Sequence, residues 1–150
     1  MIEKLKNKEP RISEKIREIF QQSYKIEAEI LEATDFPPLK RTLENFINSD
    51  TEFYAYIKNN KFAGVIEIDK KPNYVHIQSL VVNPLNFRQG IASELMNFTL
   101  NHFKSKLFVV ETGYKNEPAS NLYRNFGFIE VKQWETDFNI RKVKFELLKK

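Results

Sequence analysis

Residue types that could carry chemistry gather first in the segment that joins an apolar strand to a helix. Residues 80–82 are Leu-Val-Val, and residues 87–92 read Phe-Arg-Gln-Gly-Ile-Ala. This pattern predicts a strand, a tight connection and a helix that opens at Gly90. The unpaired N–H groups and the dipole at a helix N-terminus suit a phosphate, and glycine leaves the backbone bare for an anion. The segment favours an anion-binding turn, although it also fits an ordinary strand-to-helix connection.

A second segment, residues 116–128, reads Asn-Glu-Pro-Ala-Ser-Asn-Leu-Tyr-Arg-Asn-Phe-Gly-Phe. Tyr123 has a phenolic proton that it could donate in a reaction. It also shares a helix face with Ala119 and Phe126, so a tyrosine of the core is an alternative interpretation. Asn116, two residues before Pro118, is typical of a helix N-cap, and capping is compatible with a ligand contact.

The two segments, in this order and at this separation, resemble the signatures of the GNAT superfamily of acyl-CoA-dependent N-acetyltransferases. The signature R/Q-x-x-G-x-G/A falls on residues 87–92, where Phe87 replaces the leading Arg or Gln. Arg88, one place later, could supply the positive charge. The signature N-x-x-A-x-x-L-Y-x-x-x-G-F matches residues 116–128 at every fixed position. The resemblance covers most of the chain.

The resemblance implies that acetyl-CoA is the co-substrate and that an amine accepts the acetyl group. The N–H groups of residues 88–93 would hold the CoA pyrophosphate, and residues 80–82 would pair with the pantetheine arm. The N–H of Val82 would polarise the acetyl carbonyl, Asn116 would contact the pantetheine, and Tyr123 would act as general acid near the sulfur. The expected cofactor-binding residues are Leu80, Val81, Val82, Arg88, Gln89, Gly90, Ile91, Ala92, Ser93, Asn116 and Tyr123, with Val82 and Tyr123 as the catalytic groups.

The general base is not specified by the sequence. Many relatives carry Glu at the position of Gln78, and an amide cannot take a proton near neutral pH. Glu67, Glu111 and His76 are alternatives, acting directly or through water. Each of them also has a structural or solvent-facing interpretation, and a substrate that is already neutral is a further alternative.

The acceptor is expected between the first two helices and the last hairpin. A small amine with an apolar body is the favoured substrate, with a protein N-terminus or lysine as the alternative. A non-catalytic acyl-CoA sensor also stays open, because Phe87 and Gln78 depart from the family pattern. The residues that could line an apolar slot or attract a cation are Phe36, Tyr54, Tyr56, Tyr74, Glu27, Glu32 and Asp35.

Hydrophobic periodicity predicts the elements that must position these residues. A long helix over residues 12–31 is expected to stop before the prolines at 37 and 38, and a short second helix to follow. Strands are expected at residues 2–6, 51–58, 61–68, 74–82, 107–110, 128–134 and 143–148, with helices at 91–103 and 119–126. The order predicts an α/β fold with a mixed, mostly antiparallel GNAT-like sheet and helices on both faces.

Composition narrows the class of protein. A chain of 150 residues suits a single domain, 1–150, and the absence of cysteine excludes disulfides and thiolate metal sites. His76 and His102 have no metal-ligand spacing, so no metal is expected. No leader or membrane segment is visible and the net charge is +4, so we expect a cytoplasmic protein without nucleic-acid or membrane partners. A homodimer stays open.

Overall fold

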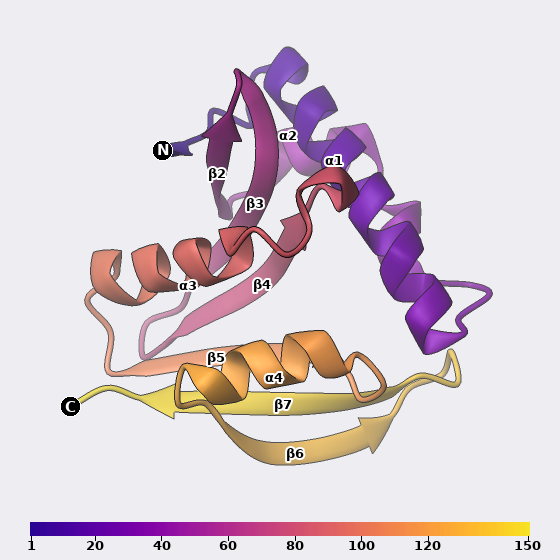
Figure 1. Ribbon diagram of the computed structural model, residues 1–150, viewed down its shortest axis with the longest axis vertical. Coiled ribbons are helices and arrows are strands. Elements are labelled where there is room, and N and C mark those ends of the chain that lie inside the picture. The colour runs from indigo at the N-terminus through magenta and orange to yellow at the C-terminus, as the bar shows by residue number, and fades with distance from the viewer.

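A computed structural model describes residues 1–150 as one seven-stranded sheet with helices on both of its faces (Figure 1). The strands are β1 (Ile2–Lys4), β2 (Glu52–Lys58), β3 (Lys61–Lys70), β4 (Val75–Val82), β5 (Leu107–Gly113), β6 (Ile129–Glu135) and β7 (Arg141–Leu148). The helices are α1 (Pro10–Leu31), α2 (Leu43–Asn48), α3 (Ile91–His102) and α4 (Glu117–Asn125), with short 3-10 turns η1 (Pro37–Lys40) and η2 (Pro84–Asn86). The predicted fold class is confirmed.

The strand order is β1-β2-β3-β4-β5-β7-β6, and only the β4–β5 pair is parallel. Side chains alternate along β3, so Val65 packs toward α1 and α2 while Ile66 packs toward α3 and α4. Both are fully buried, which explains why this strand is apolar on two faces. In Figure 1, α3 and α4 lie across the near side of the sheet.

Helix α1 follows the predicted periodicity and ends at Leu31, before the prolines, as expected. Ile16, Ile19 and Phe20 are buried against the sheet. The helix stops at Leu31 because Glu32 adopts a left-handed conformation with φ of 54°, which closes the last turn. The predicted second helix is divided into η1 and α2. No helix of the protein is long and apolar enough to cross a membrane.

The predicted hairpin between β2 and β3 is confirmed. Asn59 and Asn60 take φ values of 53° and 63°, as a type I′ turn requires. Close by, Gly64 lets α3 approach the sheet, because a Cβ there would lie 2.7 Å from Cγ2 of Ile91. The hairpin and this contact fix where α3 begins.

The parallel pair β4–β5 is short, and this shapes the centre of the molecule. Pairing begins at Val75↔Phe108 and ends at Ile77↔Val110, although both strands continue. The register between β3 and β4 shifts at Gln78, since Glu67 faces Ser79 while the next residue faces Ile77. This bulge bends β4. Beyond it the two central strands have no mutual pairing, and the sheet opens.

Candidate active site

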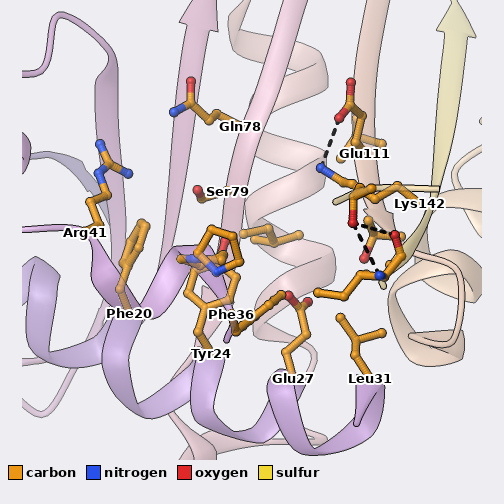
Figure 2. A pocket seen from close by; sticks show the side chains of 18 of the residues that line it. Phe20, Tyr24, Glu27, Leu31, Phe36, Arg41, Gln78, Ser79, Glu111 and Lys142 are labelled. Carbon is orange, nitrogen blue, oxygen red and sulfur yellow. Dashed lines mark hydrogen bonds and ion pairs between the residues drawn. The ribbon is translucent and has the colours of Figure 1, made fainter. Parts of the chain in front are cut away.

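A cavity of about 560 Å³ lies where β4 and β5 separate. Side chains of α1 line it from one side (Figure 2). Residues of η1 and of the connection between β6 and β7 complete its wall. The end of α1 packs tightly here, because a Cβ on Gly113 would lie 2.5 Å from Leu31. A volume of this size suits a small organic ligand. No group of His, Asp and Glu side chains could hold a metal ion.

The backbone of β4 leaves N–H groups unpaired at Leu80, which lines this cavity, and at Val82, which lies beyond its lining. Asn83 N–H donates to the carbonyl of Ala63 at 2.8 Å, which makes this a hydrogen-bonded pair of the antiparallel ladder. Alternation then turns the N–H groups of Leu80 and Val82 away from β3, toward the side where β5 has departed. This geometry is what polarisation of a carbonyl by Val82 needs; the role itself stays a prediction.

The N-terminus of α3 has the geometry expected of an anion site. Gly90 has φ of 77°, and no atom lies within 4 Å of where its Cβ would stand. The first helical bond runs from Glu94 N–H to Gly90, so the N–H groups of residues 91–93 have no partner in the helix. Arg88 is also left-handed, with φ of 64°. The turn therefore exposes a run of backbone donors.

The side chains around this turn add to the sequence-based expectation. Gln89 does not point into the turn, because its Oε1 accepts hydrogen bonds from Lys58 Nζ at 2.8 Å and Asn86 Nδ2 at 3.2 Å. Any contribution of Gln89 to anion binding would come from its backbone. Lys58, at the end of β2, brings a positive charge that the sequence motif does not include. Phe87 is exposed.

Tyr123 lies in the core and also lines the cavity, so its position is compatible with both interpretations, and its role as general acid stays a prediction. It is buried, with its ring 5.9 Å from Phe128 and 5.8 Å from Phe145, and it also lines the cavity. Burial, together with the nearby carboxylate of Glu27, raises the pKa of its hydroxyl above the ordinary value. The hydroxyl therefore keeps its proton around neutral pH, which a general acid requires.

Asn116 caps α4 as predicted and also reaches across to α1. Its Oδ1 accepts from the N–H of Ala119 at 3.4 Å, and its Nδ2 donates to Oε1 of Glu27 at 2.7 Å. The link to Glu27 joins residues 89 positions apart, so the sequence could not reveal it. The same amide that is expected at the cofactor thus orients a carboxylate of the cavity.

Of the bases left open by the sequence, Glu67 is fully committed to structure. It is completely buried, and Arg41 binds it through two N–H···O bonds of 2.7 and 2.9 Å. Thr51 and Ser79 donate two more, at 2.7 and 3.0 Å. Four donors leave this carboxylate no free position for a substrate.

The other two candidates differ in their access to the cavity. Glu111 on β5 lines it and forms an ion pair with Lys142 at 3.1 Å (Figure 2). His76 does not line it, and burial lowers the pKa of its imidazole despite the nearby Glu111 and Asp69. Gln78, which replaces the usual Glu, stands on the cavity wall.

The aromatic lining differs from the sequence-based expectation. Phe36 lines the cavity as predicted. The predictions for Tyr54, Tyr56 and Tyr74 are wrong, because none of them lines it; Tyr54 packs in the core beside Phe98. The lining residues that sequence reasoning missed are Phe20, Tyr24, Phe138 and Ile140. The spacing of Phe20 and Tyr24, one turn apart on α1, was the available signal.

The acidic residues predicted to attract a cation fall into two groups, those at the surface and one that lines the cavity. Glu32 pairs with Lys115 at 3.2 Å and Asp35 pairs with Lys40, both at the surface. Only Glu27 lines the cavity, where burial raises the pKa of its carboxyl. The acidic face therefore consists mostly of solvated ion pairs, with one carboxylate turned inward.

This chain matches a protein-family model and is similar to a curated sequence. The acetyltransferase (GNAT) family matches residues 13–128. The UPF0157 protein YqkA of Bacillus subtilis (strain 168) is 36% identical over 129 residues, which are 85% of this chain and 38% of that protein. The chain thus spans well under half the length of this curated relative.

Solved structures share the fold at low sequence identity. The ribosomal-protein-S18-alanine N-acetyltransferase from Escherichia coli has a TM-score of 0.78 and 18% identity, covering 99% of this chain and 92% of that one. The PaiA N-acetyltransferase from Thermoplasma acidophilum, solved in complex with coenzyme A, has a TM-score of 0.75 and 17% identity, covering 99% of both chains. These likenesses confirm the fold.

Proposed function

The chain belongs to the GNAT acetyltransferase family, and on that premise we propose that it transfers the acetyl group of acetyl-CoA to a primary amine of a small molecule. The observation that carries the proposal is the opening between β4 and β5. It brings the Tyr123 hydroxyl into one cavity with the strand whose Leu80 and Val82 N–H groups are unpaired. The exposed N-terminus of α3 follows directly from that strand and suits the pyrophosphate.

The chemistry follows from what these groups can do. A neutral amine attacks the thioester carbonyl, and the oxyanion that forms accepts a hydrogen bond from the N–H of Val82. One such donor stabilises the oxyanion by about 3 kcal/mol in an enclosed site. Tyr123 then donates its proton to the departing CoA thiolate. Its raised pKa keeps this proton available at neutral pH.

A small acceptor fits the cavity better than an extended chain. The wall opposite the strands is formed by Phe20, Tyr24 and Phe36, and Phe138 covers the end between β6 and β7. Such an enclosed aromatic wall favours an apolar body of limited size. A protein N-terminus or a lysine would have to enter from the open side of the cavity. Peptides that present each of them are therefore included in the activity screen described next.

The proposal is tested by measuring free thiol released from acetyl-CoA across aryl amines, alkyl amines and two peptides that present an N-terminus or a lysine. Tyr123→Phe removes only the hydroxyl, so kcat should fall by about a hundredfold or more while acetyl-CoA affinity and Tm stay near wild type. Tyr114→Phe is the matched control, because Tyr114 is exposed and lies outside the cavity.

Two results would count against the proposal. A wild-type protein that binds acetyl-CoA but acetylates none of the amines would leave the acyl-CoA sensor as the better interpretation. A Tyr123→Phe variant with lower Tm and unchanged kcat would show that this tyrosine serves only the core.

A further inference from the structure

Glu27 is a cavity-lining carboxylate that has no cationic partner. Its side chain rises from α1 toward the cavity (Figure 2), and its one hydrogen bond comes from Asn116. It takes part in none of the ion pairs of the protein, and Lys142, the nearest opposite charge, is paired with Glu111. Glu27 is half-buried, and a partly desolvated carboxylate without an ionic partner is stabilised by a cation, so a bound ammonium group would complete this site.

Helix α1 presents Glu27 as part of one face. Phe20, Tyr24, Glu27 and Leu31 are spaced by four, three and four residues, which places all of them on the same side of the helix, and all line the cavity. The single carboxylate therefore stands within an otherwise aromatic and apolar stripe. A ligand lying along this stripe would meet one negative group and several ring faces.

The rings beside Glu27 are held in place by their own contacts. Tyr24 lies edge-on to Phe36, with ring centroids 5.8 Å apart, and equally close to Phe20. Behind this wall the hydroxyl of Ser79, which also lines the cavity, donates to the buried Glu67 at 3.0 Å. This fixed wall is complementary to a ring-sized apolar body, and Glu27 is complementary to an amino group at its end.

The charges around Glu27 adjust how readily it takes a proton. Burial raises the pKa of Glu27, while the hydrogen bond from Asn116 and the charge of Lys142 on β7 lower it in part. Tyr24 on the same helix and Tyr123 on α4 face it as protonated hydroxyls, and Glu111 on β5 partly cancels Lys142. A carboxylate with a raised pKa is a stronger base than an exposed glutamate.

We infer that Glu27 binds the amino group of the acceptor and takes its proton, and that the acceptor is a primary amine with a ring-sized apolar body. The inference rests on the acetyl transfer proposed above and identifies its missing base. An ammonium ion, R-NH₃⁺, donates one proton to the Glu27 carboxylate and becomes R-NH₂. The amine attacks the acetyl carbon, the C–S bond breaks, and Tyr123 protonates the thiolate. The second proton of the amine nitrogen restores Tyr123, and Glu27 returns its proton to water.

The experiment compares wild type with Glu27→Gln, using phenethylamine as the ring-bearing probe and ethylamine as the probe without a ring. Glutamine keeps the size of the side chain and an oxygen that accepts from Asn116. We expect kcat/KM for phenethylamine to fall by about a hundredfold or more, with acetyl-CoA affinity unchanged in calorimetry. Wild type should prefer phenethylamine to ethylamine. Glu29→Gln, an exposed position on the same helix, is the control and should behave as wild type.

The pH profile of kcat/KM gives a readout that a purely structural role would not change. In wild type the rate should fall below the pKa of Glu27, on an acid limb that lies above the ordinary glutamate value of about 4.3. In Glu27→Gln this limb should vanish, and the rate should rise tenfold per pH unit toward the amine pKa, because only free amine then reacts. If Glu27→Gln fails to fold, the wild-type profile still tests the inference, because an acid limb no higher than that of an ordinary glutamate overturns it.

The outcomes separate this inference from the proposed function. An active wild type with an equally active Glu27→Gln, or a wild-type acid limb no higher than that of an ordinary glutamate, overturns the role of Glu27 alone. A wild type that acetylates none of the probes overturns the acetyl transfer, and this inference with it. Loss of the acid limb in Glu27→Gln, together with a wild-type preference for the ring-bearing amine, supports the inference that Glu27 is the base and that the acceptor carries a ring.

Discussion

The site has a cofactor end and an acceptor end, which are built from different parts of the chain and by different means. The cofactor end is expected to use backbone N–H groups from one continuous stretch, β4 and the first turn of α3, and that turn lies outside the cavity itself. The acceptor end is the cavity, which is lined by side chains from four separate places: α1, η1, β5 and the connection between β6 and β7.

This difference has a consequence for how each end tolerates substitution. Backbone donors survive a change of side chain, so Phe87 can occupy a position that usually carries Arg or Gln without removing the turn. A wall of side chains has no such protection, and each replacement alters its shape or charge. We therefore expect the cofactor end to respond strongly only to changes that block the backbone and weakly to changes of side chain, and the acceptor end to respond to single side chains.

The largest effect is expected at Gly90. Gly90→Glu places bulk and negative charge over the N–H groups of residues 91–93, so acetyl-CoA binding should fall below detection in calorimetry. Gly90→Ala is the matched control, because it bears the same left-handed backbone cost of about 1 kcal/mol without the charge. Its affinity should stay within about tenfold of wild type. Normal binding by Gly90→Glu would mean that this turn does not hold the cofactor.

At the acceptor end the largest effect is expected at Arg41, which lines the cavity and pairs with Glu67. Arg41→Ala leaves a fully buried carboxylate without its partner, so the free energy of unfolding should fall by about 3–5 kcal/mol in a denaturant titration. Arg41→Met combined with Glu67→Met removes both charges and should recover much of the loss. A single variant as stable as wild type would show that the pair does not support this wall.

Asn116 is hydrogen-bonded to Glu27 at the acceptor end and is also expected to contact the cofactor. Substitutions at this position therefore test whether the two ends are independent. Asn116→Ala removes the cap of α4 and the bond to Glu27, which should lower unfolding free energy by about 1 kcal/mol and weaken both acetyl-CoA binding and amine turnover. Asn116→Asp keeps an oxygen for the cap but faces Glu27 with a like charge. This raises the pKa of Glu27 further, so the acid limb of kcat/KM should move to higher pH. An acid limb that stays at the wild-type pH would show that Asn116 does not influence the pKa of Glu27.

The smallest effect is expected at Arg88, an exposed charge beside the turn. Arg88→Ala should weaken acetyl-CoA binding severalfold at low salt and little at high salt, because mobile ions screen exposed charges. Phe87→Arg combined with Arg88→Gly restores the usual signature and gives the left-handed position 88 a glycine. This double variant should retain binding. A loss that is independent of salt would assign the effect of Arg88 to packing.

The sequence predicted the helices and strands well because these depend on local patterns. Apolar spacing located α1, α3 and the strands, and Asn59-Asn60 predicted the hairpin turn. The predictions failed where contacts between distant residues decide, since Tyr54 packs in the core instead of lining the cavity. No local pattern distinguishes a tyrosine that faces the core from one that faces a ligand.

By itself the sequence determined the family, the order of helices and strands, and the run of backbone donors that begins at Gly90, since these follow from neighbouring residues. Only the tertiary structure decided which side chains meet in the cavity. The separation of β4 from β5 after Ile77 opens the space, and the packing of α1 across it brings Glu27 to Asn116 and close to Tyr123. The physical reason is that these residues, far apart along the chain, become neighbours only when both sides of the sheet have folded.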